Sequence, residues 1–100
     1  IQLIHRQIDQ IVPHIFHIII LKKINIKIIR AKLLSFGIET GIHYFPNHEL
    51  TYYKTSKIVT LNNTDTIKNK LFSLPLHVDL QENEVLYICD TLISILNENI

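Results

Sequence analysis

The apolar residues of this chain fall into segments whose spacing predicts strands and helices. Residues 15–21 form a run of β-branched and aliphatic side chains, which favours a strand buried on both faces. Residues 26–36 carry one apolar stripe at helical spacing and are predicted to form a helix. That stripe consists of Ile26, Ile29, Leu33 and Phe36. Asn25 is a candidate N-cap, and Gly37 can adopt the left-handed conformation that ends a helix.

Three further segments complete the regular structure. Residues 38–44 are expected to return as a short strand beside the first, which gives a β-α-β unit. Residues 71–76 predict a strand that Pro75 confines to an edge or an end of the sheet. Asp79 and Glu82 are a candidate capping pair for a last helix with a wide apolar stripe. The stripe consists of Val85, Ile88, Cys89, Leu92, Ile95 and Leu96.

The remaining residues are less regular. Residues 1–10 alternate loosely and are interpreted as a linker or a frayed strand, and residues 48–56 as irregular structure or one short helix. The run 62–65 marks a turn and a cap for another short helix, with Ile67 and Leu71 inside and lysines outside. Together the segments predict a single α/β (α+β) domain over 1–100, with a small antiparallel or mixed sheet packed against about three helices.

Composition narrows the classes of protein that fit. With 47% hydrophobic and 19% charged residues, 100 residues can bury a core, so disorder is not expected. The net charge of +1 and lysines scattered along the sequence predict neither nucleic acid nor a membrane as partner. The single Cys89 fits a reducing, cytoplasmic compartment, and its place on the apolar stripe predicts a buried, inert thiol. Residues 11–21 are too short to span a bilayer.

The segment 37–48 concentrates the candidate chemistry, because it holds both glycines and two of the six histidines. His43, Tyr44 and His48 are expected to face a ligand or a partner. No dedicated metal site is expected, since His14 and His17 would point to opposite faces of a strand and the other histidines lack ligand spacing. No nucleophile or phosphate motif is present. Without a basic groove, the tyrosines at 44, 52 and 53 favour ligand lining over RNA binding.

Three stretches, in this order and spacing, resemble one known family. They are residues 14–17 before the apolar strand, residues 34–48 with 52–54 downstream, and residues 74–80 before the last helix. They resemble the C-terminal part of the DegT/DnrJ/EryC1/StrS aminotransferases, which act on nucleotide sugars and depend on pyridoxal 5'-phosphate. The resemblance implies the C-terminal small domain of a fold-type-I aminotransferase. The large domain, with the cofactor and its Schiff-base lysine, is then absent from this chain.

The resemblance also implies a function. Family members transfer an amino group, typically from glutamate, to a keto sugar on a nucleoside diphosphate, and they work as homodimers. The Phe-Pro-Asn-His version of the motif is similar to members that make amino sugars for surface polysaccharide, including lipopolysaccharide. By this resemblance His43, Tyr44, His48 and His77 are expected to bind substrate, although each could instead be a scaffold residue.

None of the lysines is expected to be the catalytic one, so the chain alone is expected to be inactive and to bind pyridoxal phosphate poorly or not at all. A second hypothesis is a non-catalytic module that keeps the fold for dimerisation or for binding a sugar nucleotide. Under both hypotheses an apolar patch is expected where the large domain would dock, with self-association as the consequence.

Overall fold

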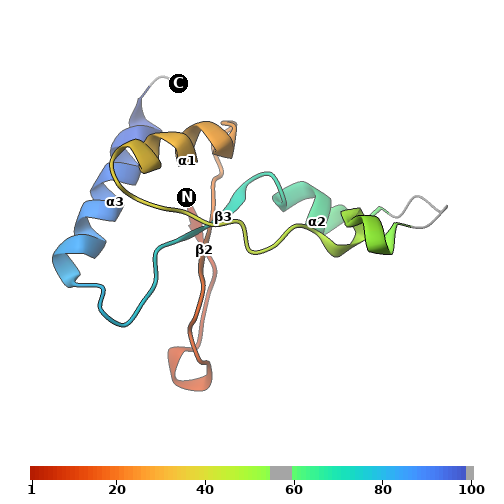
Figure 1. The fold of residues 1–100 in the computed structure, drawn as a ribbon, viewed down its shortest axis with the longest axis horizontal. Coiled ribbons are helices and arrows are strands. Elements are labelled where there is room, and N and C mark those ends of the chain that lie inside the picture. The colour runs from red at the N-terminus through yellow and green to blue at the C-terminus, as the bar shows by residue number, and fades with distance from the viewer. Residues whose placement is uncertain (55–59, 99–100) are drawn as a thin grey trace.

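The computed structural model describes residues 1–54 and 60–98, and shows an α+β arrangement with a three-stranded antiparallel sheet (Figure 1). The strands are β1 (Gln2–Leu3), β2 (Phe16–Ile19) and β3 (Leu71–Leu74). The α-helices are α1 (Ile26–Ser35), α2 (Asn62–Ile67) and α3 (Glu82–Asn97). Short 3-10 helices are η1 (Ile8–Gln10), η2 (Asn47–Glu49) and η3 (Thr51–Tyr53). The predicted fold class is confirmed.

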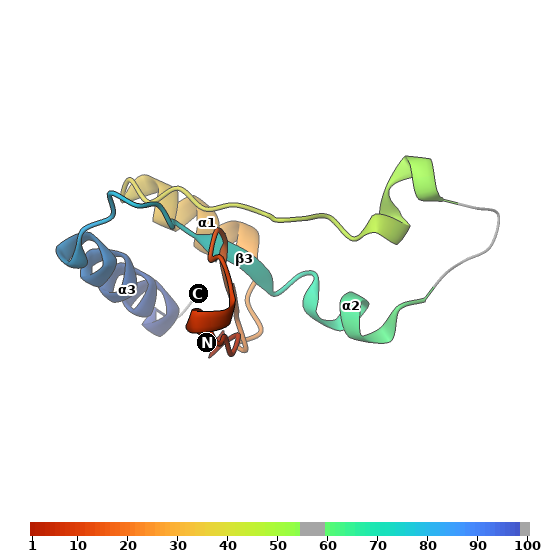
Figure 2. The ribbon, with the colours of Figure 1, turned by 90° about the horizontal axis from the view of Figure 1, so that it is seen from below.

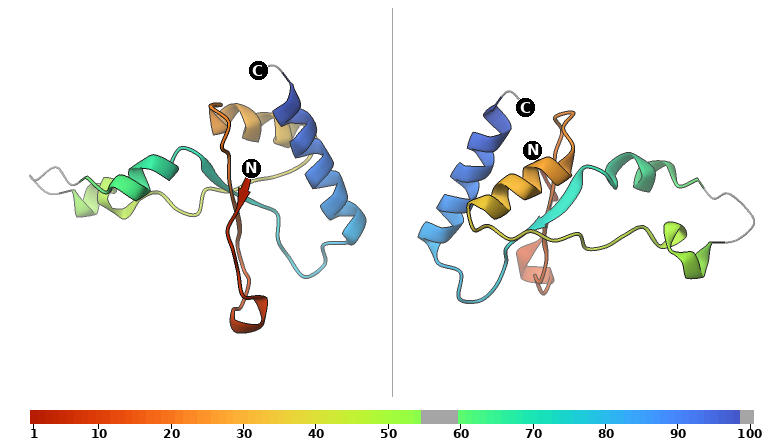
Figure 3. Two further views of the ribbon diagram at one scale, coloured as in Figure 1. Left: turned by 180° about the vertical axis from the view of Figure 1, so that it is seen from behind. Right: turned by 45° about the horizontal axis from the view of Figure 1, so that its top comes forward.

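The molecule has two regions, a body and an arm that extends away from it. The sheet, α1 and α3 form a body, made of residues 1–43 and 71–98 (Figure 2). The described residues between 44 and 70, with η2, η3 and α2, extend away from the body, and we call them the arm. The hairpin that joins β1 to β2 through η1 also projects from the body, in a direction different from that of the arm (Figure 3).

The sheet has the order β1-β2-β3, with β2 at its centre. Ile18 of β2 lies opposite Phe72 of β3, and both side chains are buried in a core shared with α1 and α3. The predicted β-α-β unit is wrong, because β2 pairs with β3 in antiparallel orientation. Residues 38–44 contribute only an isolated bridge, between Gly41 and Ser73. The physical reason is that the apolar run of β3 takes the place beside β2, which leaves the segment after α1 outside it.

Helix α1 has both of the end signals that its sequence predicts. The Asn25 side chain accepts a 2.9 Å hydrogen bond from the backbone N–H of Lys27, which confirms the predicted N-cap. At the other end Gly37 has φ +77°, and the N–H groups of Gly37 and Ile38 bond back to the carbonyls of Leu34 and Leu33. This is the hydrogen-bond pattern of a Schellman motif. The last residue of the predicted stripe does not join the core, since Phe36 is 52% exposed.

Helix α3 buries a narrower stripe than predicted. Its buried apolar residues are Ile88, Leu92 and Ile95. Val85 and Cys89 are exposed, so the prediction of a buried thiol is wrong. The helix has α1 and the sheet on one side only, and side chains beside the central stripe therefore face outward. The capping pair is also shifted by two residues, because the Glu84 carboxylate accepts the backbone N–H of Gln81 at 2.8 Å.

The less regular segments match their predictions in part. Residues 1–10 include the two-residue strand β1. In the arm, α2 begins at Asn62, although residues 62–65 are predicted to be a turn and cap before the helix. Leu71, which is predicted to lie inside this helix, belongs to β3. The predicted irregular segment 48–56 contains short 3-10 turns, and its residues 55 and 56 lie outside the described part of the chain. Within the described residues, no helix has the length and apolar character needed to cross a membrane.

Candidate functional site

The segment between α1 and the arm is extended and separates two cavities. Gly41 exchanges two backbone hydrogen bonds with Ser73, of 3.1 and 2.8 Å, and this pairing holds the segment against β3. Alternate residues of the segment then line opposite cavities. Gly41 and His43 line one, whereas Ile42 and Tyr44 line the other. The predicted strand over 38–44 does not form, but these four residues alternate between the two cavities as residues of an extended segment do.

The first cavity, which we call the imidazole pocket, has a volume of about 720 Å³. Its walls come from the residues after α1, from the connection between β3 and α3, and from the first turns of α3. His43 and His77 both line it, together with Glu39, Glu84 and Tyr87. Two of the four predicted substrate-binding residues, 34 positions apart in sequence, are therefore neighbours of one cavity.

His43 is held in place by two small residues. Its Nδ1 lies 2.7 Å from the hydroxyl oxygen of Ser73, a side chain that is almost fully buried. The ring packs so closely against Gly41 that a Cβ there would be 2.2 Å from Cε1. Only glycine leaves that space. Because Nδ1 is engaged, Nε2 is the ring nitrogen that can donate to or accept from a ligand.

A second histidine lies behind His43. The His17 ring, on β2 opposite Ser73, has its centroid 6.5 Å from that of His43. Its Nε2 is buried and has no hydrogen-bond partner among the described residues. His77 has a different position, in the connection after β3, where its carbonyl accepts the N–H of Leu80 at 3.2 Å and its side chain is exposed.

The second cavity, which we call the basic groove, has a volume of about 690 Å³. Its cationic lining residues are Lys22, Lys23, Lys27, Arg30, Lys68 and Lys70. These are six of the ten lysines and arginines of the chain, so charges that are scattered along the sequence gather around one groove in the structure. Tyr44 lines this groove, with Phe45 beside it, instead of facing the imidazole pocket. Sequence spacing missed the groove because its cations come from two segments about forty residues apart.

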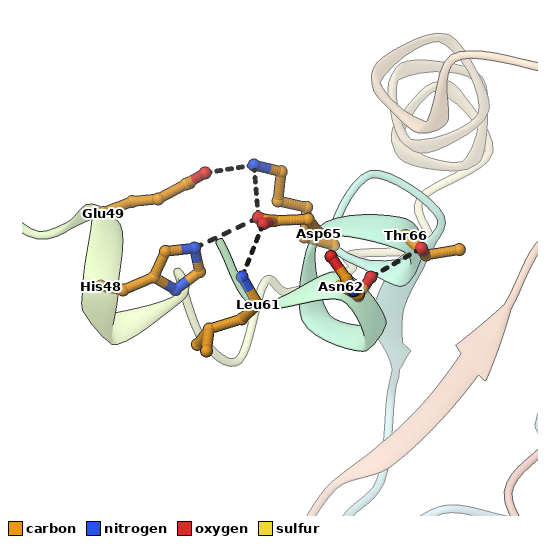
Figure 4. A network of polar contacts seen from close by, with 7 residues as sticks. His48, Glu49, Leu61, Asn62, Asp65 and Thr66 are labelled. Carbon is orange, nitrogen blue, oxygen red and sulfur yellow. Dashed lines mark hydrogen bonds and ion pairs between the residues drawn. The ribbon is translucent and has the colours of Figure 1, made fainter. Parts of the chain in front are cut away.

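His48, the fourth predicted residue, lies in the arm and belongs to a polar network (Figure 4). Its Nε2 is 3.2 Å from Oδ1 of Asp65 in α2, and Oδ2 of the same carboxylate accepts the N–H of Leu61. The Lys68 ammonium lies 3.1 Å from Asp65 and also pairs with Glu49. The network ties the two legs of the arm together, and His48 is half-buried within it.

The network shifts two ionisable groups. The hydrogen bond from Lys68 lowers the pKa of the Asp65 carboxyl, and the hydrogen bond to Glu49 raises the pKa of the Lys68 ammonium. Ligand atoms of His48, Glu49 and Asp65 lie within 4.8 Å of one another, a grouping that could hold a metal ion. The Lys68 ammonium already pairs with both carboxylates, so a cation would have to displace it. Sequence spacing gave no sign of this cluster.

Comparison with known proteins identifies a family and two relatives that are similar to this chain. The family model described as the DegT/DnrJ/EryC1/StrS aminotransferase family matches residues 2–93. Two relatives from Campylobacter jejuni, of serotypes O:2 and O:23/36, are each named UDP-4-amino-4,6-dideoxy-N-acetyl-beta-L-altrosamine transaminase. Each is 33% identical over 69 residues, which is 66% of this chain. The chain spans only 18% of the length of each relative.

Proposed function

Because the chain belongs to the DegT/DnrJ/EryC1/StrS aminotransferase family, we propose that it forms the C-terminal part of an enzyme that aminates a nucleotide-linked keto sugar. The observation that carries this proposal is the family match over residues 2–93. The names of the Campylobacter relatives, which are UDP-sugar transaminases, support a uridine diphosphate carrier. We further propose glutamate as the amino donor.

The cofactor of the proposed reaction is pyridoxal 5'-phosphate, which acts as an electron sink when bound. A lysine amine is required to hold it covalently. Among the described residues no lysine lines the imidazole pocket, so the residues there do not fit the cofactor. The lysines of the basic groove are exposed or are paired with acceptors, as Lys22 is with the carbonyl of Leu96 at 2.6 Å. The cofactor is therefore proposed to bind outside this chain, and the chain by itself is proposed to be inactive.

This chain's own contribution is proposed to be substrate binding. His43, oriented by Ser73, and His77 are proposed to hydrogen-bond the sugar from the imidazole pocket. Both are polar groups on the wall of a cavity that also has apolar lining residues, and such groups fix the orientation of a ligand. Tyr44 is proposed to contact the substrate from the basic groove. For His48 the arm network supports a role in positioning the loop that follows Tyr44.

The whole enzyme is proposed to be a cytoplasmic homodimer whose product enters surface polysaccharide, such as lipopolysaccharide. Exposed apolar side chains on the outer faces of α1 and α3 support association with further protein. Leu34 is 62% exposed and Phe36 is 52% exposed, and the Tyr87 hydroxyl donates to the Phe36 carbonyl at 2.9 Å.

The proposal is tested with the whole protein that carries this chain. We expect it to show the visible absorption of bound pyridoxal phosphate and to aminate a UDP-linked keto sugar with glutamate. A colourless protein that binds the sugar nucleotide without aminating it would instead establish the non-catalytic module.

The role of the imidazole pocket has its own test. We expect His43→Ala to lower kcat/KM about tenfold or more, because the substrate loses a hydrogen bond. His5→Ala, which removes an exposed histidine outside both cavities, is the matched control and should leave kcat/KM unchanged. Equal kinetics for the two variants would remove His43 from the substrate site.

A further inference from the structure

We propose that the basic groove binds the nucleoside diphosphate half of the substrate, with the two phosphates on its lysines and the base against its aromatic wall. The location of this subsite rests on the geometry of the groove. The identity of the ligand as a nucleoside diphosphate rests on the proposed function.

The first step of the argument is charge. Six cationic side chains line the groove and Glu49 is its one acidic residue, so the lining carries a formal charge of 6 − 1 = +5. The whole chain carries only +1. A cleft with one sign of charge concentrates ligands of the opposite sign, and a diphosphate is a compact ligand of high negative charge.

The second step is the availability of that charge. Glu49 pairs with Lys68, and no other carboxylate lines the groove in the part of the chain that the structure describes. Lys23, Lys27 and Lys70 are exposed and have no ion-pair partner among the described residues. Arg30 donates to the hydroxyl and the carbonyl of Thr40, both neutral acceptors that leave its charge uncompensated. Four cations are therefore left for a ligand.

The third step is the shape of the lining. Helix α1 begins at the groove, where Asn25, Ile26 and Lys27 form part of its wall, so the positive end of a ten-residue helix adds to the lysine charge. Tyr44 and Phe45 also line the groove and are 75% and 68% exposed. Flat aromatic side chains left open to solvent beside cations suit a nucleobase, which stacks on them without regard to its sequence context. The volume of about 690 Å³ fits a small molecule.

The test uses the whole protein loaded with pyridoxal phosphate, so that the phosphate of the cofactor does not compete for the groove. Isothermal titration calorimetry measures the affinities for UDP, inorganic pyrophosphate and uridine. We expect UDP to bind most tightly and pyrophosphate to bind more tightly than uridine. The double variant Lys27→Gln with Lys70→Gln should weaken UDP and pyrophosphate about tenfold or more, since two charge-assisted contacts are lost.

Two further variants sharpen the assignment. Tyr44→Ala should lower the affinity for UDP about fivefold or more and leave the affinity for pyrophosphate unchanged, because only the base stacks on the ring. The double variant Lys32→Gln with Lys54→Gln removes the same charge outside the groove and should leave all three affinities within about twofold. An equal loss in both lysine doubles would show a general charge effect and would overturn the proposal. The proposal would also be overturned if a single-stranded oligonucleotide bound more tightly than UDP and if only the Lys27→Gln with Lys70→Gln variant lost that binding.

Amination of a UDP-linked keto sugar, measured on the same samples, separates this inference from the proposed function. An active aminotransferase whose UDP affinity and KM are unchanged in the groove double contradicts the inference and leaves the function standing. A protein that loses UDP binding in the groove double but never aminates a sugar supports the groove and contradicts the function.

Discussion

The body and the arm are held together by different forces. In the body, α1, α3 and the sheet share a core of buried isoleucine, leucine and phenylalanine side chains. None of the described arm residues from 44 to 70 belongs to that core. The legs of the arm are joined by the His48–Asp65 and Lys68 contacts, while Tyr52 is 90% exposed. The body is therefore stabilised by burial within the chain, and the arm by a few polar contacts that solvent can reach.

This difference predicts which substitutions will change the free energy of unfolding most. Apolar burial contributes in proportion to the area removed from water, whereas exposed ion pairs contribute little. Truncations in the body should therefore affect global stability, and changes in the arm should affect only local order. Three substitutions test that division, beginning with the largest expected effect.

Leu33→Ala should have the largest effect, because this side chain of α1 is fully buried in the core. Truncation of a buried leucine costs about 2–5 kcal/mol through lost burial and the cavity left behind. Hydrogen exchange of the α1 and α3 amides in the whole protein measures the change. Tyr52→Ala in the arm is the control and should change the free energy of opening by less than about 0.5 kcal/mol. Similar losses in the two variants would refute the division.

Gly41→Ala should have an intermediate effect at the junction of the two regions. The added Cβ would overlap the His43 ring, which must turn away from Ser73 and leave that buried hydroxyl unsatisfied. Such a loss costs about 1–3 kcal/mol. In a His43→Ala background the same substitution should cost far less, and a double-mutant cycle measures the coupling. Additive effects would show that the ring does not occupy the space against Gly41.

Asp65→Asn should have the smallest global effect and a local one. It removes the negative charge that Lys68 pairs with, so the amides of α2 should exchange faster while those of α1 do not change. Asp90→Asn, an exposed position on α3, is the control. Protection of α1 that falls together with that of α2 would mean that the arm and the body unfold as one unit.

The pH dependence of the arm follows from the same pair. The folded pKa of Asp65 lies below its usual value of 3.8, so its contribution is full above that value and is lost as the pH falls through the lowered pKa. The folded pKa of Lys68 lies above 10.5, so its contribution is full below that value and is lost as the pH rises through the raised pKa. Exchange of the α2 amides at acidic pH should show the first of these losses.

Local signals made helix α1 of the body predictable. The stripe of α1, with Asn25 before it and Gly37 after it, predicts a helix over 26–36, and the structure has Ile26–Ser35. The partner of β2 could not be predicted in the same way. Both 38–44 and 71–76 are apolar enough to pair with it, and a periodic pattern does not say which segment occupies a sheet edge. The antiparallel pairing is decided by contacts between distant residues.

The site was predictable only where one motif supplies its residues. His43 was singled out because it lies in a segment with special backbone positions, and His77 by resemblance to the family. Their meeting in one cavity required the fold. The basic groove was missed because the turn before α1 and the end of the arm each contribute only a few of its cations. Charge clusters assembled across about forty residues leave no local pattern.

The alternation along residues 41–44 restrains the length of the segment. Insertion or deletion of a single residue between Gly41 and Tyr44 would exchange the faces of every residue that follows, up to the arm. The imidazole would then project among the lysines, and the phenol would project toward His77. We expect related chains to preserve the residue count of this segment, so that gaps in an alignment fall within the arm instead.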